Sequence, residues 1–256
     1  MGEGAPPAVS AVNEGGASPY VLLCEHASNF VPERYGGLGL GPRDLGRHIA
    51  WDIGAADVAR GLSRRLDAPL FLSGRSRLLI DCNRPPGAPT SIPARSEDTD
   101  IPGNLDLDAA ERARREAAFF APFHAAVARH LDRRAAEGRA AAVVGVHSFT
   151  PVFLGVERPW HVGVLYAGAE RFGRALVERL GADPGPPVGD NEPYRIEPEE
   201  HDYTVPVHGD RRGLDAALIE VRQDLIADPA GAASWADRLA AALRDVAAAG
   251  GAAARR

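Results

Sequence analysis

Short, wholly apolar runs alternate along this chain with longer segments of helical periodicity. Residues 20–24 (YVLLC) and 141–147 are runs of this kind, and both lead into polar residues. A strand that is apolar at every position has both faces buried, which is typical of a parallel sheet inside an α/β protein. The pattern predicts a three-layer α/β/α sandwich, in which a mixed, mostly parallel central sheet is covered by helices on both faces.

The apolar runs and periodic segments place the individual elements. Strands are expected at residues 20–24, 69–72, 78–82, 141–147, 162–166 and 217–221. Helices are expected at residues 52–66, from Asn104 or Asp106 to about 136, at 169–180 and at 232–248. Residues 85–103 and 185–202 are expected to be long loops, which in compact domains are usually functional or mobile.

The two ends of the chain have no periodic pattern. Residues 1–19 are rich in Gly, Ala, Pro and Ser, so we expect a flexible lead-in, and residues 249–256 are expected to be a frayed tail. The length of 256 residues fits one α/β domain or at most two small ones. Residues 20–248 are expected to form a single domain.

The basic residues exclude several classes of function. All 29 are arginine, and the missing lysine excludes Walker-type phosphate loops, Schiff-base chemistry and pyridoxal phosphate. A net charge of −6, with arginines alternating with acids, argues against nucleic acid as a partner.

No apolar run approaches the roughly 18 residues of a membrane span. The first 19 residues lack a signal-peptide pattern, so we expect a cytoplasmic protein. Cys24 and Cys82 are expected to be reduced packing residues.

Polar side chains stand at the ends of four expected strands. Ligands of open α/β sheets bind at the carboxyl ends of the strands. Polar groups that follow buried runs are costly unless they are satisfied or used. The groups in question are Glu25 with His26, Asp81 to Arg84, His147 with Ser148, and Glu220 with Arg222.

His26 and His147 are candidate metal ligands. Two histidines, one carboxylate and a water form an open catalytic zinc site. Asp52, at an expected helix start, is near enough in sequence to His26 to complete such a site. No compact ligand motif such as His-Glu-x-x-His is present. On the residues alone, two hydrogen-bonded histidines at strand ends are the more frequent outcome.

Arginines cluster around the expected strand at residues 78–82. Asn83 and Arg84 follow it, and an arginine fork beside an amide suits a substrate carboxylate. A simple turn, with Arg84 paired to Asp81, fits the same residues. Arg75 and Arg77 precede the strand and could stabilise an oxyanion, although exposed arginines there are usually solvated.

Glu220 interrupts a run that otherwise looks fully buried. A buried carboxylate near a metal can act as general base on a bound water. The alternative is a structural ion pair with Arg222, which lies two residues on and therefore on the same strand face. A nucleophilic serine has no candidate, because the chain lacks a Gly-x-Ser-x-Gly elbow.

Taken together, these segments resemble the N-formylglutamate amidohydrolase family. The resemblance rests on His26, on Asp52 within AWDIGA, and on the segments SRLLIDCNR, GVHSF and LIEVR, and it runs from about Tyr20 to Leu225. It implies a catalytic domain over residues 20–248 with a phosphorylase/hydrolase-like fold, similar to zinc carboxypeptidases and aspartoacylases. It also implies a hydrolase acting on linear amides, with one zinc ion per chain.

The resemblance also implies roles for individual residues. His26 and His147 match the metal-binding histidines, and Asp52 is taken as the third ligand. Glu220 is placed like the glutamate that serves as general base and acid. Carboxypeptidases have a glutamate ligand three residues after the first histidine, where this chain has Asn29; Glu25 is the substitute if Asp52 is not a ligand.

For the substrate, the resemblance implies a second set of residues. Asn83 and Arg84 look like the pair that holds a substrate carboxylate. Arg77, and less surely Arg75, would hold the polarised carbonyl, and His208 matches a family position near the substrate. The expected reaction is zinc-assisted hydrolysis of the N-formyl, or another small N-acyl, amide of an acidic amino acid such as N-formylglutamate.

Two other classes of protein stay open. A metal-free binding protein for carboxylate metabolites would use Arg84, Arg77 and Arg75 but would tolerate loss of His147. A zinc phosphoesterase would direct the same cations to a phosphate, and usually needs two metals with more ligands. A small molecule is the expected partner in all three cases, and the sequence does not indicate an oligomeric state.

Overall fold

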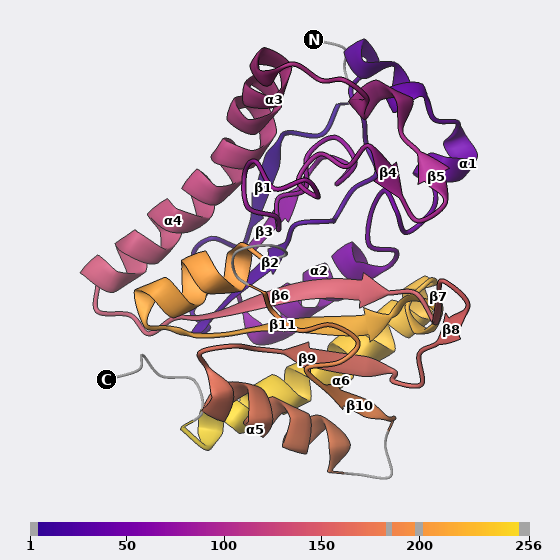
Figure 1. Ribbon diagram of the computed structural model, residues 1–256. Helices are drawn as coiled ribbons and strands as arrows, with labels where there is room; N and C mark the ends of the chain where they lie inside the picture. Colours follow the sequence, from indigo (N-terminus) through magenta and orange to yellow (C-terminus); the bar gives the residue numbers. More distant parts are fainter. Residues whose placement is uncertain (1–4, 183–185, 198–201, 251–256) are drawn as a thin grey trace.

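The computed structural model describes residues 5–182, 186–197 and 202–250. Seven strands form one central sheet: β1 (Val9–Val12), β2 (Tyr20–Cys24), β3 (Leu70–Ser73), β6 (Ala142–Phe149), β9 (Val162–Leu165), β10 (Val188–Asp190) and β11 (Asp215–Arg222). Their order is β1-β3-β2-β6-β11-β9-β10 (Figure 1). Neighbours run parallel except at β1–β3 and β9–β11, which are antiparallel. The sheet is therefore mixed and mostly parallel, as predicted.

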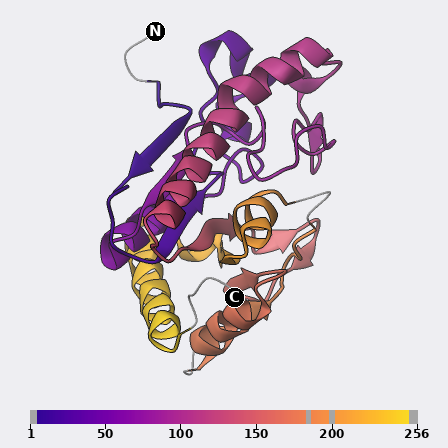
Figure 2. The same ribbon diagram turned by 90° about the vertical axis from the view of Figure 1, so that its left-hand side faces the viewer.

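Helices cover both faces of the sheet. They are α1 (Pro42–Leu45), α2 (Ala55–Leu66), α3 (Ala109–Arg115), α4 (Ala121–Ala136), α5 (Glu170–Gly181) and α6 (Pro229–Ala248). One hydrophobic cluster joins one face of the sheet to α2, α5 and α6, and a second joins the other face to α4 (Figures 1 and 2). The predicted three-layer sandwich is confirmed. Among the described residues, no helix is long and apolar enough to cross a membrane.

Burial on both faces explains why the central strands are apolar throughout. Along β2, Leu22 packs into the cluster with α2, whereas Val21 and Leu23 pack into the cluster with α4. Successive side chains of a strand point to opposite faces, so each position of β2 meets a helix layer. Cys24 and Cys82 are buried free thiols, in agreement with their expected packing role.

Two smaller sheets and a π-helical segment between α3 and α4 complete the fold. The small sheets are β4 (Arg95–Ser96) with β5 (Thr99–Asp100), and β7 (Val152–Phe153) with β8 (Val156–Glu157). A π-helical segment, Glu116–Phe120, joins α3 to α4. The long helical segment begins at Ala109, later than Asn104 or Asp106, because Asp108 caps it by accepting a hydrogen bond from the Glu111 amide.

Two sequence predictions for the first half of the chain need correction. The expected helix at 52–66 begins only at Ala55, because Gly54 precedes it with a φ of 79° and Asp52 is engaged elsewhere. The expected strand at 78–82 is wrong. These residues form turns, and Leu78, Leu79 and Ile80 are buried in a third hydrophobic cluster. An apolar run can satisfy its burial in a packed loop as well as in a sheet.

The edges of the sheet hold strands that the sequence did not predict. Val9–Val12, within the expected flexible lead-in, pairs antiparallel with β3 as edge strand β1. Val188–Asp190, within the expected loop at 185–202, pairs with β9 as the opposite edge, β10. Edge strands are short and only half covered, so their sequences lack the fully apolar pattern of the central strands. Residues 251–256 of the expected tail lie outside the described residues.

Candidate active site

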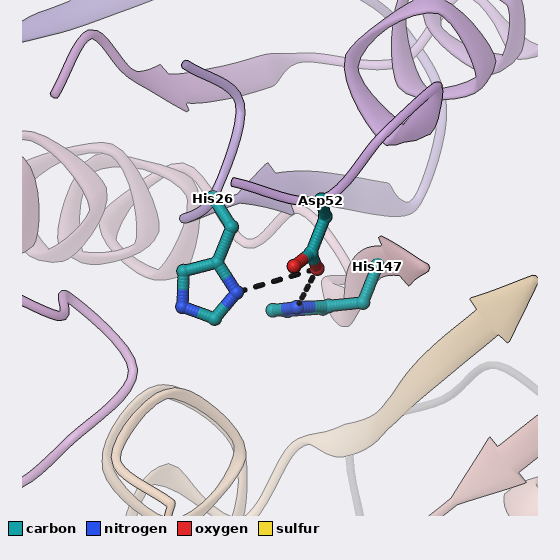
Figure 3. A group of neighbouring side chains, drawn as sticks. All are labelled: His26, Asp52 and His147. Carbon is teal, nitrogen blue, oxygen red and sulfur yellow. Dashed lines mark hydrogen bonds and ion pairs between the residues drawn. The ribbon is translucent and has the colours of Figure 1, made fainter. Parts of the chain in front are cut away.

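His26, Asp52 and His147 come together at the carboxyl ends of β2 and β6. Nδ1 of His26 lies 3.3 Å from Oδ2 of Asp52, and Nδ1 of His147 lies 2.9 Å from the same oxygen (Figure 3). All three side chains are buried. One donor atom from each lies within 4.8 Å of the others, and within the described ranges no other group of three such residues could hold a metal.

Hydrogen bonds fix the loop that carries Asp52 to both strands. The Asp52 amide donates to the carbonyl of His26 (3.0 Å). The Ser148 amide donates to Oδ2 of Asp52 (3.2 Å), and its hydroxyl donates to the carbonyl of Ile53 (2.9 Å). A Cβ at Gly54 would lie 2.2 Å from the Ile226 carbonyl oxygen, so only glycine fits there. The carboxylate is thus held in place before any ligand binds.

A further carboxylate lies behind each histidine. Nε2 of His26 is 2.7 Å from Oδ1 of Asp81, and Nε2 of His147 is 3.1 Å from Oε2 of Glu25. Glu25 also accepts a hydrogen bond from the Thr204 hydroxyl. Both rings are therefore oriented through Nε2, which leaves the two Nδ1 atoms directed at Asp52.

The ionisation of this group is set by its partners. Burial opposes the charge on His147, but hydrogen bonds to Asp52 and Glu25 raise its pKa well above the ordinary value. Burial likewise opposes the charge on Glu25, yet His147 and Thr204 lower its pKa to about 2. The two histidines hold the pKa of Asp52 far below its ordinary range. The site is a cluster of buried carboxylates that requires positive charge.

Arg77 supplies part of that positive charge. Its Nη2 donates to Oδ2 of Asp81 (2.7 Å), and its Nη1 lies 3.5 Å from Oδ1 of Asp52. Although burial opposes ionisation of Asp81, Arg77 and then His26 hold the pKa of this carboxyl well below its ordinary value. From the sequence, Asp81 was expected at a strand end, with Arg84 as its possible partner, and not as a partner of His26. Its position four residues after Arg77 was the available signal.

Glu220 lies beside this group without joining it. It is the register partner of His147 across the parallel β11–β6 pair and of Gly163 on β9. Its Oε2 is buried and has no hydrogen-bond partner among the described residues. Burial, together with the negative charge of Asp52, raises its pKa to about 7. A carboxyl group with this pKa can both accept and return a proton near neutral pH.

The alternative interpretation of Glu220 as an ion-pair partner is not supported. Arg222 pairs with Asp224 instead, through distances of 2.8 Å from Nε and 3.1 Å from Nη2. Arg222 also donates from Nη1 to the main-chain carbonyl of Arg158. Oε2 of Glu220 thus has no partner among the described residues, and its side chain shares a face of the sheet with its register partner His147.

Asn83 and Arg84 differ in how the structure uses them. The Asn83 side chain donates to Asp202 (3.1 Å) and accepts from the amides of Tyr203 (3.3 Å) and Thr204 (3.0 Å). It therefore anchors the segment that carries Thr204. Arg84 is half-buried, and its positive charge lowers the pKa of Asp81. The Arg84 amide donates to the carbonyl of Asp81 (3.2 Å), so Arg84 lies close in the chain to the carboxylate that contacts His26.

Arg75 and His208 contact other parts of the fold. Arg75 donates to the carbonyls of Pro6 and Gly74 (both 2.7 Å), and its guanidinium lies over the Phe30 and Phe119 rings. None of these contacts joins it to the histidine group. Nε2 of His208 is 2.9 Å from Nδ1 of His124, and the His208 Nδ1 atom is buried without a partner in the described part of the chain.

Comparisons with known proteins show which family the chain belongs to. The sequence profile of the N-formylglutamate amidohydrolase family matches residues 18–227, which include every residue of the group described above. No curated protein matches the chain in sequence.

Solved structures also match over nearly the whole chain. The gene product Atu2144 from Agrobacterium tumefaciens is 40% identical, with a TM-score of 0.90 over 96% of this chain and 99% of that chain. An N-formylglutamate amidohydrolase from Ralstonia eutropha JMP134 is 20% identical, with a TM-score of 0.66 over 96% of this chain and 98% of that chain. The second likeness is one of fold.

Proposed function

The chain belongs to the N-formylglutamate amidohydrolase family, and we propose that it is a zinc-dependent amidohydrolase. Its substrate in this proposal is the N-formyl, or another small N-acyl, derivative of an acidic amino acid such as N-formylglutamate. The observation that carries the proposal is the convergence of the His26 and His147 Nδ1 atoms on one oxygen of Asp52.

The residues present fit a bound metal ion. Two imidazole nitrogens and one carboxylate are a common donor set for catalytic zinc, with one position left for water. Metal-binding histidines usually direct their second nitrogen to a carboxylate, as His26 does to Asp81 and His147 does to Glu25. A divalent cation would also supply the positive charge that protonation of His147 supplies without it. Glu25 then supports a ligand, and Asp52 completes the set.

A zinc ion held by these residues would act as a Lewis acid on the acyl oxygen and lower the pKa of water. Glu220 accepts a proton from the attacking water at Oε2, and the water oxygen forms a bond to the acyl carbon. Glu220 then returns the proton to the leaving nitrogen as the carbon–nitrogen bond breaks. The products are formate, or another small carboxylate, and the free amino acid.

The arginines would position the substrate. Arg77 orients Asp52 and Asp81 and can stabilise the negative charge that develops on the acyl oxygen. Arg84, set in place next to Asn83, is proposed to bind a substrate carboxylate. The unpartnered Nδ1 of His208 is proposed to accept a hydrogen bond at the substrate side. We propose no substrate contact for Arg75.

Metal content is the first test. Protein purified without added metal and without a histidine tag should carry about one zinc per chain, and the His147→Ala variant should carry none. Formate release from N-formylglutamate should depend on that zinc. His130→Leu, which changes another buried histidine, on α4, is the matched control and should retain both zinc and turnover.

The other outcomes identify the rival classes. No zinc in the wild type, and none on reconstitution, would contradict the hydrolase mechanism and leave a binding protein for carboxylate metabolites. Two metals per chain and hydrolysis of phosphate esters would indicate a phosphoesterase instead.

A further inference from the structure

Arg158 is a buried cation enclosed by aromatic rings. It follows β8 directly, and only 8% of the residue is exposed. Its Cζ atom lies 4.6 Å from the centroid of the Phe153 ring, 4.7 Å from that of Tyr194 and 5.9 Å from that of Phe149. Nη1 donates to the Tyr194 hydroxyl at 2.8 Å. Ring faces stabilise a guanidinium, but they do not neutralise its charge.

The described residues provide Arg158 with no carboxylate and no carbonyl acceptor. Two other arginines that lack an acidic partner, Arg75 and Arg134, differ from it. Arg75 donates to main-chain carbonyls, and so does Arg134, at Ser18 and Ala140. Nη1 of Arg158 bonds to Tyr194, and the other two nitrogens, Nε and Nη2, are partly exposed to solvent. A buried guanidinium with open donors is suited to an anion.

Arg158 lies over a ring on the side of the sheet that carries the histidine group. Phe149, which packs under Arg158, is two residues after His147 on β6, so the two side chains share a face about 7 Å apart. Glu220 shares this face through its register with His147. The Tyr194 hydroxyl accepts the hydrogen bond from Arg158, and burial, together with the charge of Glu220, raises its pKa.

We propose that Arg158, positioned by the Tyr194 hydroxyl, binds a carboxylate of the substrate. This rests on the proposed function and adds a second cationic subsite to the one proposed at Arg84. A diacid such as an N-acylglutamate has two carboxylates, and the two arginines would each receive one. The aromatic rings cover part of the Arg158 guanidinium, and a hydrogen bond from a charged donor to a carboxylate is stronger than a neutral one. The subsite therefore selects for acidic substrates.

Three substrates that differ in one charge test the proposal. They are N-formylglutamate, N-formylglutamine, in which the side-chain carboxylate is an amide, and N-formylglutamate α-amide. The wild type should prefer the diacid over one of the two amides by about 10- to 100-fold in kcat/KM because of Arg158. In Arg158→Met that preference should fall toward unity, and Arg158→Lys should restore part of it. The amide affected identifies which carboxylate Arg158 binds.

Arg75→Met is the matched control, because Arg75 also lies over two aromatic rings. It should lose thermal stability and keep both preferences. If Arg158→Met keeps both preferences, Arg158 is a structural residue and the proposal is wrong. Should Arg158→Met fail to fold, Arg158→Lys and Tyr194→Phe apply the same comparison, with a smaller loss of preference expected.

Binding separates this proposal from the proposed function. Glutarate, a simple dicarboxylate, should bind the wild type at least about tenfold more tightly than Arg158→Met in titration calorimetry. If the wild type hydrolyses none of the three substrates but shows this difference, the proposed function fails and the anion subsite stands. Equal glutarate affinity in the two proteins would overturn the subsite.

Discussion

Two pairs of buried histidines on the same chain differ in the partners that surround them. His26 and His147 face the carboxylates of Asp52, Asp81 and Glu25, whereas His124 and His208 face each other. Burial lowers the pKa of His124 to about 4 and that of His208 to about 3. The pKa of His147 is raised although His147 is equally buried. For these buried imidazoles, the presence of carboxylate partners decides whether the pKa is raised or lowered.

The uncharged pair has a defined hydrogen-bond direction. Nε2 of His124 is 2.7 Å from the carbonyl of Cys82, which can only accept, so this nitrogen carries the proton. Nδ1 of His124 is then the acceptor for Nε2 of His208. Neither ring has a carboxylate within hydrogen-bond distance in the described ranges. This pair suits a neutral hydrogen-bonded link that leaves His208 Nδ1 as an acceptor, whereas the first pair suits a cation.

The largest expected effect comes from Glu220, the acid that stands beside His26 and His147 without bonding to them. Glu220→Gln should lower kcat by about 10²- to 10⁴-fold, because the amide cannot accept a proton, while zinc content is unchanged. The base acts in its ionised form, so wild-type kcat/KM should decrease as the pH falls through the pKa of Glu220, which is at or below about 7 in the active enzyme. A bound cation would move this acid limb down from the pKa of about 7. Steady-state rates between pH 5 and 9 test this.

The loss of the acid limb in Glu220→Gln is the critical comparison. A variant that keeps both the wild-type rate and the limb would show that another group accepts the proton. Loss of zinc together with turnover would instead make Glu220 part of the metal site.

Asp81 gives the next largest effect, because it bonds to His26, one of the two proposed histidine ligands. Asp81→Asn keeps a hydrogen-bond acceptor for His26 Nε2 but removes the negative charge. Zinc affinity should fall by about 10- to 100-fold, measured by competition with a chelator. Asp190→Asn is the control, since Asp190 bonds to the Tyr166 hydroxyl at the far edge of the sheet. Equal affinities in the two variants would mean that Asp81 does not support the ligand.

His26 and His147 could be found from sequence because they lie at or near the ends of otherwise apolar strands. His26 follows β2, and His147 and Glu220 lie near the ends of β6 and β11, where an α/β sheet binds ligands. Register then brings Glu220 opposite His147, which needed only the two strands to be neighbours. The site therefore follows from the part of the fold with the strongest pattern.

The supporting residues could not be found in the same way. Arg158 follows a short hairpin with no periodic signal, and Asp81 lies in turns that the sequence presents as a strand. Arg75 and Arg77 stand two residues apart with similar neighbours, yet the first binds main-chain carbonyls and the second binds carboxylates. Their roles depend on which segments pack across from them, and that depends on tertiary contacts.

The smallest expected effect concerns His130, a histidine on α4 that extends the uncharged class. Its ring packs against Phe71, its Nδ1 is 3.0 Å from Nη2 of Arg133, and its Nε2 is buried without a partner among the described residues. Burial, together with Arg133 and Arg134, lowers its pKa to about 4. An unfolded histidine titrates near 6.5, so below that pH the unfolded chain binds the proton first. His130 therefore reduces stability as the pH falls from about 6.5 toward 4.

His130→Leu removes this proton linkage while keeping an apolar side chain of similar size against Phe71. Compared with the wild type, the variant should lose less stability between pH 7.5 and pH 5, by on the order of 1 kcal/mol. Urea unfolding at the two pH values measures the difference. Because the neighbouring carboxylates titrate alike in both proteins, their contribution cancels in this comparison. Parallel losses in the two proteins would mean that His130 is already protonated in the folded state, and that burial without a carboxylate does not keep an imidazole neutral here.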